Sequence, residues 1–291
     1  MGQLGYLFTS LRPRQWTKNL LVFAALIFAL KLDSAEALLR AIEAFLLFCT
    51  GTGGLYLLND LLDLAADQTH PRKRLRPLPS GKLNQASALY ASAVLICGSL
   101  LLAIPLGEGF LASYAAYVGL VLAYNLGVKH WPIAESLVVA LGFLLRAIAG
   151  ALVISVEISS WFLVCTFFLA LLLVLGKRRV ELVSLPDSAS HRAALAHYTS
   201  QLLDQYILIA ATGAILTYCL YTFALQTLAK FPGAHLELTI PFVVFGVFRY
   251  LWILYTQEKA GAPEEVLITD RPILMNLFLF LLVAVAVIYW R

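Results

Sequence analysis

Asn59-Asp60-Leu61-Leu62-Asp63-Leu64-Ala65-Ala66-Asp67 ends an apolar run that begins near Ala44. If the run continues as a helix, Asn59, Asp63 and Asp67 lie along one stripe at about 100° per residue. Asp60 then lies one ridge away. Carboxylates that share a face repel one another unless a cation lies between them. Hard oxygen ligands suit Mg²⁺, which binds through a few carboxylates and substrate phosphates. We therefore predict that Asp60, Asp63 and Asp67 hold Mg²⁺ and are the catalytic residues.

A dense group of cations follows this acidic stretch. Arg72-Lys73-Arg74-Leu75-Arg76 carries four positive charges within five residues. A solvated helix end followed by a charged loop is the simpler explanation of such a sequence. The asparagine, the shared face and the adjoining cations together favour a metal and phosphate site instead.

The composition is that of an integral membrane protein. Of the 291 residues, 61% are hydrophobic and 13% are charged, and the mean hydropathy is +0.83, whereas soluble domains carry about 25% charged residues. Lipid offers no partner to an open sheet edge, and the long apolar runs lack the alternation of a β-barrel. We predict an all-α fold, a polytopic membrane bundle of about nine helices that forms a single domain over residues 1–291. The expected spans are roughly 19–32, 38–59, 86–106, 110–128, 134–155, 160–177, 203–228, 238–256 and 273–290.

Lysine and arginine are distributed unevenly between the two ends of these spans. When the loops are assigned alternately to two faces, one face holds fifteen of the 21 cations and the other holds four. The positive-inside rule, with an odd number of spans, then predicts a cytoplasmic N-terminus and an external C-terminus. The expected location is the inner (plasma) membrane. The longer polar loops fall on the cytoplasmic side, so we expect the active site to open there. Residues 1–18 read as an amphipathic interfacial lead-in.

A second set of polar residues lies at the same ends of the later spans: Tyr124, Lys129, Glu135, Lys177 and Arg178. Arg146 lies about three turns inside the fifth span. Charge within a membrane is costly and usually functional, so Arg146 is expected to line a cavity. The alternative is that Arg146 is a buried partner of one carboxylate. Lys177 and Arg178 are also compatible with ordinary cations that flank a span.

Other familiar chemistries have no support in the sequence. The four cysteines lie in apolar runs without CxxC spacing, and the histidines lack the spacing of metal ligands. The sequence contains no Walker loop, GxGxxG loop or serine nucleophile elbow, and no nucleic-acid partner is expected. Carboxylates that hold Mg²⁺, with cations for the remaining phosphate oxygens, instead predict a transferase. Its substrates would be a diphosphate donor and a lipid held by the apolar bundle.

Three motifs resemble the UbiA superfamily of intramembrane prenyltransferases. They are Asn59-Asp60-x-x-Asp63-x-x-x-Asp67, Arg76-Pro77-Leu78-Pro79-Ser80-Gly81 and Tyr124-x-x-x-x-Lys129, and the similarity extends over nearly the whole chain. Prenyltransferases of that superfamily carry a second acidic motif near the fifth span, where this sequence retains only Glu135. The departure favours a donor other than an isoprenyl diphosphate.

Four further stretches resemble the decaprenyl-phosphate phosphoribosyltransferase branch of the superfamily: residues 12–19, 142–150, 176–178 and 263–271. This resemblance implies a Mg-dependent pentosyltransferase. Its donor would be phosphoribosyl diphosphate (PRPP), its acceptor a polyprenyl (decaprenyl) phosphate, and its products polyprenyl-phosphoryl-5-phosphoribose and diphosphate. Where this branch serves cell-wall arabinan synthesis, the product is an arabinan precursor. The many cations of the cytoplasmic face fit three phosphate-bearing groups better than one prenyl diphosphate.

Each candidate residue has an expected role. Asn59 orients a metal ligand or water; Arg72, Lys73, Lys177 and Arg178 bind donor phosphates; Gln15, Lys18 and Asn19 receive the lipid phosphate; Tyr124 and Lys129 position the ribose or leaving group; and Glu135 stands in for the second acidic motif, with Arg146 inside the membrane.

Two alternatives remain open. A UbiA-type prenyltransferase would move an isoprenyl chain to an aromatic or other lipid acceptor. A transporter or lipid-binding protein would need charged or broken helices near the bilayer midplane, whereas most ionisable residues here lie at one face. Strict dependence of product formation on a divalent metal separates the enzymes from the last class. The oligomeric state is also open, and a homo-oligomer is one of its outcomes.

Overall fold

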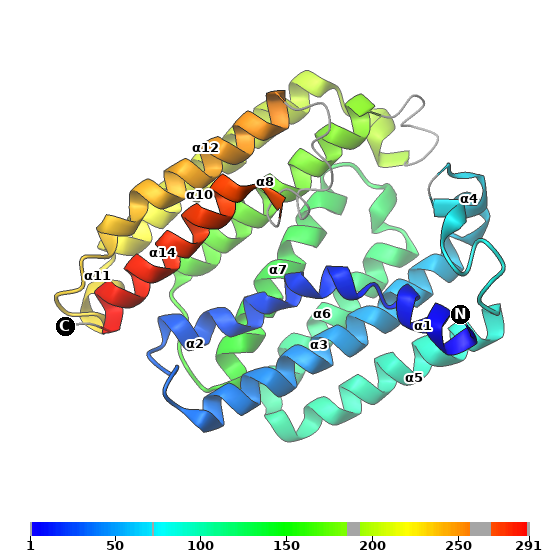
Figure 1. Ribbon diagram of the computed structural model, residues 1–291, viewed down its shortest axis with the longest axis horizontal. Helices are drawn as coiled ribbons and strands as arrows, with labels where there is room; N and C mark the ends of the chain where they lie inside the picture. Colours follow the sequence, from blue (N-terminus) through cyan, green and yellow to red (C-terminus); the bar gives the residue numbers. More distant parts are fainter. Residues whose placement is uncertain (1, 72, 185–192, 257–268, 290–291) are drawn as a thin grey trace. The chain divides into compact units, whose positions relative to one another are not determined.

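The computed structural model describes residues 2–71, 73–184, 193–256 and 269–289, and these residues form helices and turns without any strand (Figure 1). Eight of the helices, two of them extended by a 3₁₀ turn, are long and apolar enough to cross a bilayer. The predicted all-α, multi-pass membrane architecture is thus confirmed. The long helices are α3 (Ala35–Leu62), α5 (Gln85–Ala103), α6 (Glu108–Leu126), α7 (Ala134–Val153), α8 (Ser160–Ser184), α10 (Ser200–Phe223), α12 (Ile240–Thr256) and α14 (Arg271–Tyr289). The short elements, in which η marks a 3₁₀ helix, are α1 (Gln3–Ser10), η1 (Pro13–Phe23), α2 (Ala24–Phe28), α4 (Leu64–Thr69), η2 (Lys73–Leu75), η3 (Ile104–Leu106), η4 (Val128–His130), η5 (Ala193–His197), α11 (Leu225–Lys230) and η6 (Leu236–Thr239).

The first expected span, residues 19–32, is not a single α-helix. It is built from the end of η1, followed by α2, and it ends before Leu30, whose φ is +56°. A 3₁₀ helix rises about 2.0 Å per residue, so η1 and α2 together reach about 30 Å, close to the thickness of a bilayer core. The number of nine spans therefore stays a prediction, beside the eight long helices found among the described residues.

The chain folds as two compact units. The first comprises Met1–Trp131 and Leu145–Glu157, and the second comprises Pro132–Leu144 and Ile158–Arg291. Helix α7 contributes its first half to the second unit and its second half to the first. The single domain expected over residues 1–291 stays a prediction.

Close packing of α3 against α5 and α6 forms the core of the first unit. Phe48 of α3 contacts the rings of Tyr114 and Tyr117 of α6, with centroids 4.9 and 5.1 Å apart. The Tyr114 hydroxyl lies 2.8 Å from both the Leu47 carbonyl and the Ser99 hydroxyl. A Cβ on Gly51 would lie 2.0 Å from that hydroxyl. The glycine is thus what allows the helices to approach so closely, as small residues do in membrane bundles.

The second unit is organised around α8 and α10, which pack along each other and are joined by α12 and α14. Leu172, Leu203 and Ile207 are among the buried residues of this core. Arg249 of α12 forms an ion pair with Asp270 at 2.9 Å. The hydrogen bond from Arg249 holds the pKa of Asp270 below its usual value.

Candidate active site

The acidic stretch spans a break between two helices. Helix α3 ends at Leu62, and Asp63, with φ −94° and ψ 8°, joins it to α4. The predicted stripe of Asn59, Asp63 and Asp67 assumed one uninterrupted helix, and the structure breaks that helix at Asp63. Helical hydrogen bonding continues across the break, because the Asp63 amide donates to the Asn59 carbonyl and the Asp67 amide to the Asp63 carbonyl, at 2.9 and 2.8 Å. The joint keeps Asp60 and Asp67 on the same side of the chain.

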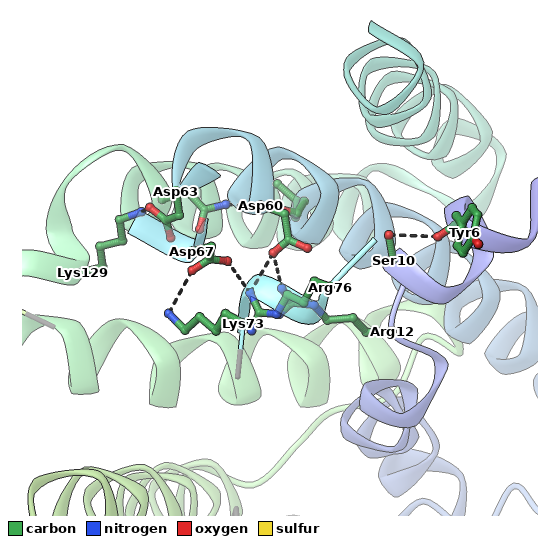
Figure 2. Close-up of polar contacts among 11 residues, drawn as sticks. Tyr6, Ser10, Arg12, Asp60, Asp63, Asp67, Lys73, Arg76 and Lys129 are labelled. Carbon is green, nitrogen blue, oxygen red and sulfur yellow. Dashed lines mark hydrogen bonds and ion pairs between the residues drawn. The ribbon is translucent and has the colours of Figure 1, made fainter. Parts of the chain in front are cut away.

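Asp60 and Asp67 converge on one arginine (Figure 2). Arg76 Nη1 lies 3.1 Å from Asp60 Oδ1 and 2.7 Å from Asp67 Oδ2. Arg12 makes a second ion pair with Asp60 Oδ1, and Lys73 Nζ lies 3.3 Å from Asp67 Oδ1. The side chains of Asp60 and Asp67 are only 2% and 1% exposed. Two buried carboxylates are thus stabilised by three cations from other parts of the chain.

Asp63 faces a different cation. Lys129 Nζ, from the 3₁₀ turn η4 that follows α6, lies 2.5 Å from Asp63 Oδ1. The Asp63 side chain is 25% exposed, which makes it the most accessible of the three carboxylates. The structure thereby brings together two residues that lie 66 positions apart in the sequence.

One hydrophobic cluster positions both arginines. Leu57 of α3 and Leu78 of the loop after Arg76 are buried in it, and Leu7 and Leu11 of the lead-in pack against it. The lead-in is also tied to the loop, because the Gln3 side chain contacts the Lys82 carbonyl at 3.0 Å and the Asn84 amide at 3.3 Å. This packing places the segments that carry Arg12 and Arg76 beside the end of α3.

Arg12 has a strained backbone. Its φ of 55° and ψ of 62° are left-handed, which costs a residue with a Cβ about 1–2 kcal/mol. Its guanidinium lies over the Tyr56 ring, 4.7 Å from the centroid, and pairs with Asp60. These contacts of a strained residue mark the turn as part of the site rather than as a simple membrane lead-in.

Arg12 and Arg76 were not among the residues predicted from the sequence as site residues. Both occur in Arg-Pro dipeptides, Arg12-Pro13 and Arg76-Pro77, inside stretches that carry the family resemblance. That shared dipeptide is the signal that could have pointed to them. The neighbouring lysines and arginines hide this signal, because each of them could equally well pair with a carboxylate or a phosphate.

Arg146 lies in a buried polar network in the first unit. Its Nε donates to Asn19 Oδ1 at 2.8 Å, and its Nη2 donates to the Tyr117 hydroxyl at 2.7 Å. Its guanidinium also lies 4.5 Å from the centre of the Tyr117 ring. Asn19 is fully buried, and its amide nitrogen also contacts Cys49 Sγ at 3.3 Å. Asn19 was expected to receive a lipid phosphate at the interface, but the structure engages its amide inside the protein.

In the second unit, Glu135 is completely buried and paired with Arg178. Arg178 Nε lies 2.8 and 3.0 Å from the two Glu135 oxygens, and its Nη1 lies 2.7 Å from Glu181. The Ser136 hydroxyl donates to Glu135 at 2.6 Å. The only carboxylate at the position of a second acidic motif is therefore neutralised within its own unit. The expected role of Arg178 with donor phosphates stays a prediction.

A strained residue also precedes Glu135. Ile133 has φ +65°, unusual for a β-branched side chain, and its amide donates to the Tyr198 hydroxyl at 2.5 Å. Burial raises the pKa of Tyr198, so its hydroxyl stays protonated at neutral pH.

The remaining candidates are placed as follows. Gln15, Lys18, Asn59 and Tyr124 are half-buried in the first unit, Lys177 is half-buried in α8 of the second, and Arg72 lies outside the described residues.

The donor set around Asp60 and Asp67 fits a divalent metal. Both buried carboxylates direct an oxygen at one point, which is occupied by the positively charged Arg76 nitrogen. Hard oxygens that converge on a cation position are what Mg²⁺ requires. In the described parts of the chain, no three His, Cys, Asp or Glu side chains are grouped closely enough to hold a metal as they stand. Binding would therefore require Arg76 to move and Asp63 to turn from Lys129.

Several known proteins are similar to this chain in sequence or in fold. The UbiA prenyltransferase family model matches residues 20–277. A decaprenyl-phosphate phosphoribosyltransferase of Mycolicibacterium smegmatis is 35% identical over 285 residues, covering 94% of this chain and 89% of the relative. Its namesake in Corynebacterium glutamicum is 35% identical, with 90% and 80% covered. A UbiA homologue from Archaeoglobus fulgidus, solved with GPP and Mg²⁺, is 18% identical and has the same fold, with a TM-score of 0.75 and with 97% of this chain and 99% of that chain covered.

The family match extends over most of the chain and includes the acidic stretch, the Arg76 loop and the strained turn at Ile133. The named relatives are transferases, and their similarity includes almost the full length of the protein. This multi-pass membrane enzyme is accordingly a transferase that belongs to the UbiA prenyltransferase family.

Proposed function

We propose that the enzyme transfers 5-phosphoribose from PRPP to a polyprenyl phosphate such as decaprenyl phosphate, and releases diphosphate. The observation that carries the proposal is the cluster of Asp60, Asp63 and Asp67 with four cations in direct contact. Such a cluster suits a substrate that brings both a metal and several phosphates. The names of the two 35% identical relatives support the same donor and acceptor.

A divalent metal, which we propose to be Mg²⁺, would be held by Asp60 and Asp67 with Asp63 beside them and Asn59 orienting a ligand. When bound, it would neutralise the diphosphate and make it a better leaving group. The fold neighbour with bound GPP and Mg²⁺ supports this choice of ion. In the chemical step, the C1–O bond to diphosphate breaks and an oxygen of the lipid phosphate bonds to C1.

The residues of the first unit would orient the two substrates. Lys73 and Arg72 would hold donor phosphates, while Tyr124 and Lys129 would position the ribose or the leaving group. The polyprenyl phosphate is already anionic at neutral pH, so the attack needs no strong general base. Positioning and electrostatic stabilisation would supply the rate. Gln15 and Lys18 would bind the lipid phosphate, with the site open to the cytoplasmic side of the plasma membrane.

Prenyl transfer is the second candidate, because the family description and the GPP-bound neighbour both point to it. That reaction in this family uses two acidic motifs. Here the sole carboxylate of the second motif, Glu135, is buried and bonded to Arg178 and Ser136. This arrangement favours phosphoribosyl transfer. Where the branch serves cell-wall synthesis, the product would be an arabinan precursor.

The test is transfer of label by the purified enzyme. Protein in lipid nanodiscs is incubated with Mg²⁺, radiolabelled PRPP and a polyprenyl phosphate, and label in the organic phase is counted. We expect transfer that is lost with EDTA and in Asp63→Asn. Asp33→Asn, at an exposed aspartate in the same unit, is the matched control and should keep full activity. Consumption of an isoprenyl diphosphate without movement of ribose label would reject the proposal in favour of prenyl transfer.

A further inference from the structure

The protein itself supplies more positive charge to the acidic cluster than the cluster has negative charge. Its three carboxylates are in contact with four cations, Arg12, Lys73, Arg76 and Lys129. An approaching free divalent cation therefore meets a site with a net positive charge. A metal already bound to a diphosphate carries a net negative charge and is attracted to the same site.

Arg76 has a special place among these cations. It is the residue that bridges the two buried carboxylates, with one nitrogen within 3.1 Å of Asp60 and 2.7 Å of Asp67. Two carboxylates this close and this buried repel each other strongly unless a cation lies between them. Arg76 thus provides in the ligand-free protein the charge that a metal would provide.

We infer that Arg76 is a positioning residue that occupies the metal's place between Asp60 and Asp67, so that metal enters together with the diphosphate donor and not alone. For the identity of the donor this inference rests on the proposed function, but the competition between Arg76 and metal does not. When the metal–diphosphate complex binds, the guanidinium exchanges its two carboxylates for phosphate oxygens. The two exchanges occur together, so neither a buried carboxylate nor the arginine is left unpaired at any stage.

The loop that carries Arg76 allows such an exchange. The Arg76 side chain is 31% exposed, whereas the carboxylates of Asp60 and Asp67 are almost fully buried. The backbone beyond it is held by Pro77 and Leu78, since the Leu83 amide donates to the Pro77 carbonyl at 2.9 Å and Leu78 lies in the hydrophobic cluster. The side chain can therefore change partners while the backbone keeps its place.

Binding of Mn²⁺ by the purified full-length protein tests the inference. Free Mn²⁺ is measured by electron paramagnetic resonance, with and without inorganic diphosphate, and the Mn²⁺–diphosphate complex formed in buffer is subtracted. We expect the wild type to bind Mn²⁺ at least tenfold more tightly with diphosphate than without it. In Arg76→Gln, Mn²⁺ alone should bind at least tenfold more tightly than in the wild type.

The neighbouring arginine gives the matched control. Arg74 lies in the 3₁₀ turn η2, two residues before Arg76, and is exposed, so Arg74→Gln should leave the Mn²⁺ affinity unchanged. Arg76→Lys, which keeps the charge, should behave more like the wild type than Arg76→Gln does. If Arg76→Gln fails to fold, Arg12→Gln removes one cation from Asp60 and should show the same change at smaller size.

Equal Mn²⁺ affinity with and without diphosphate in the wild type would overturn the inference, as would unchanged affinity in a folded Arg76→Gln protein. These results are independent of the transferred group. A protein that shows the expected Mn²⁺ behaviour but moves no ribose label retains this inference and loses the proposed function. Conversely, ribose transfer by a wild-type protein that binds Mn²⁺ alone as tightly as with diphosphate would support the proposed function and reject this inference.

Discussion

Substitution of Gly51 by alanine should separate α3 from α6. The added Cβ would lie 2.0 Å from the Tyr114 hydroxyl, far inside normal contact distance, and 3.0 Å from the Ser99 hydroxyl, which is a tight contact. Tyr114 is fully buried and cannot swing away without losing its contacts to Leu47 and Ser99. Overpacking costs about 1–3 kcal/mol and a lost hydrogen bond about 1 kcal/mol, against a gain of about 0.5–1 kcal/mol from replacing a helical glycine. We expect a net loss of about 2–3 kcal/mol.

Thermal unfolding in detergent, followed by tryptophan fluorescence, measures this loss as a fall in Tm of roughly 5–10 °C. Gly98→Ala is the matched control, because a Cβ at Gly98 meets nothing within 4 Å and should be neutral or slightly stabilising. Adding Tyr114→Phe to Gly51→Ala removes the clashing oxygen and should recover part of the loss. A Gly51→Ala protein that unfolds like the wild type, or a double variant no more stable than the single one, would refute the reasoning. Because Asp60 lies about two and a half turns further along α3, we also expect the transfer rate to fall in Gly51→Ala.

Three further predictions concern charge and strain. Lys129→Gln should lower the rate of label transfer more than tenfold without lowering Tm, because it removes the partner of the partly exposed Asp63 but leaves no deeply buried charge; an unchanged rate would exclude Lys129 from the site. Ile133→Gly should raise the free energy of unfolding by about 0.5–1 kcal/mol, because relief of the strained positive φ outweighs the extra backbone entropy that glycine loses on folding at this half-exposed position. A lower Tm would show that the Ile133 side chain is needed for packing. The pKa of Asp270 is lowered in the folded state, so its carboxylate should stabilise the fold fully above its ordinary pKa of about 4, and this stability should be lost as the pH falls through the lowered value. Asp270→Asn should remove this part of the pH profile of Tm. An identical profile in the variant would count against the pair with Arg249.

The sequence was most informative where the signal is local. Asp60, Asp63 and Asp67 are close in the chain, so the pattern of charge at the end of an apolar run was enough to find them. The same holds for the long helices, whose apolar runs leave no other structure in a bilayer. The break at Asp63 was not foreseen, because helical periodicity continues across it and the hydrogen bonds of the helix do too.

The ion pairs between residues far apart in the chain could not be predicted from the sequence. Arg12 reaches Asp60 across 48 residues, and Arg178 reaches Glu135 across 43. Every lysine and arginine has the same formal charge. The packing of Leu11 and Leu78 in one cluster helps to place the segments of Arg12 and Arg76 beside the end of α3. The 3₁₀ form of residues 13–23 was likewise missed, since hydropathy gives the length of an apolar run but not its helical pitch.

The attachment of α1 to the loop that carries Arg76 has a practical consequence for anyone who handles the enzyme. The Gln3 side chain is hydrogen-bonded to the Lys82 carbonyl and the Asn84 amide, and Leu7 packs against the hydrophobic cluster that contains Leu78. We therefore expect an affinity tag or fluorescent fusion at the N-terminus to disturb the segments that place Arg12 and Arg76 beside Asp60. The same tag at the C-terminus follows α14, which belongs to the other compact unit. Activity lost on N-terminal tagging should thus return when the tag is cleaved, and a C-terminal tag should serve for purification.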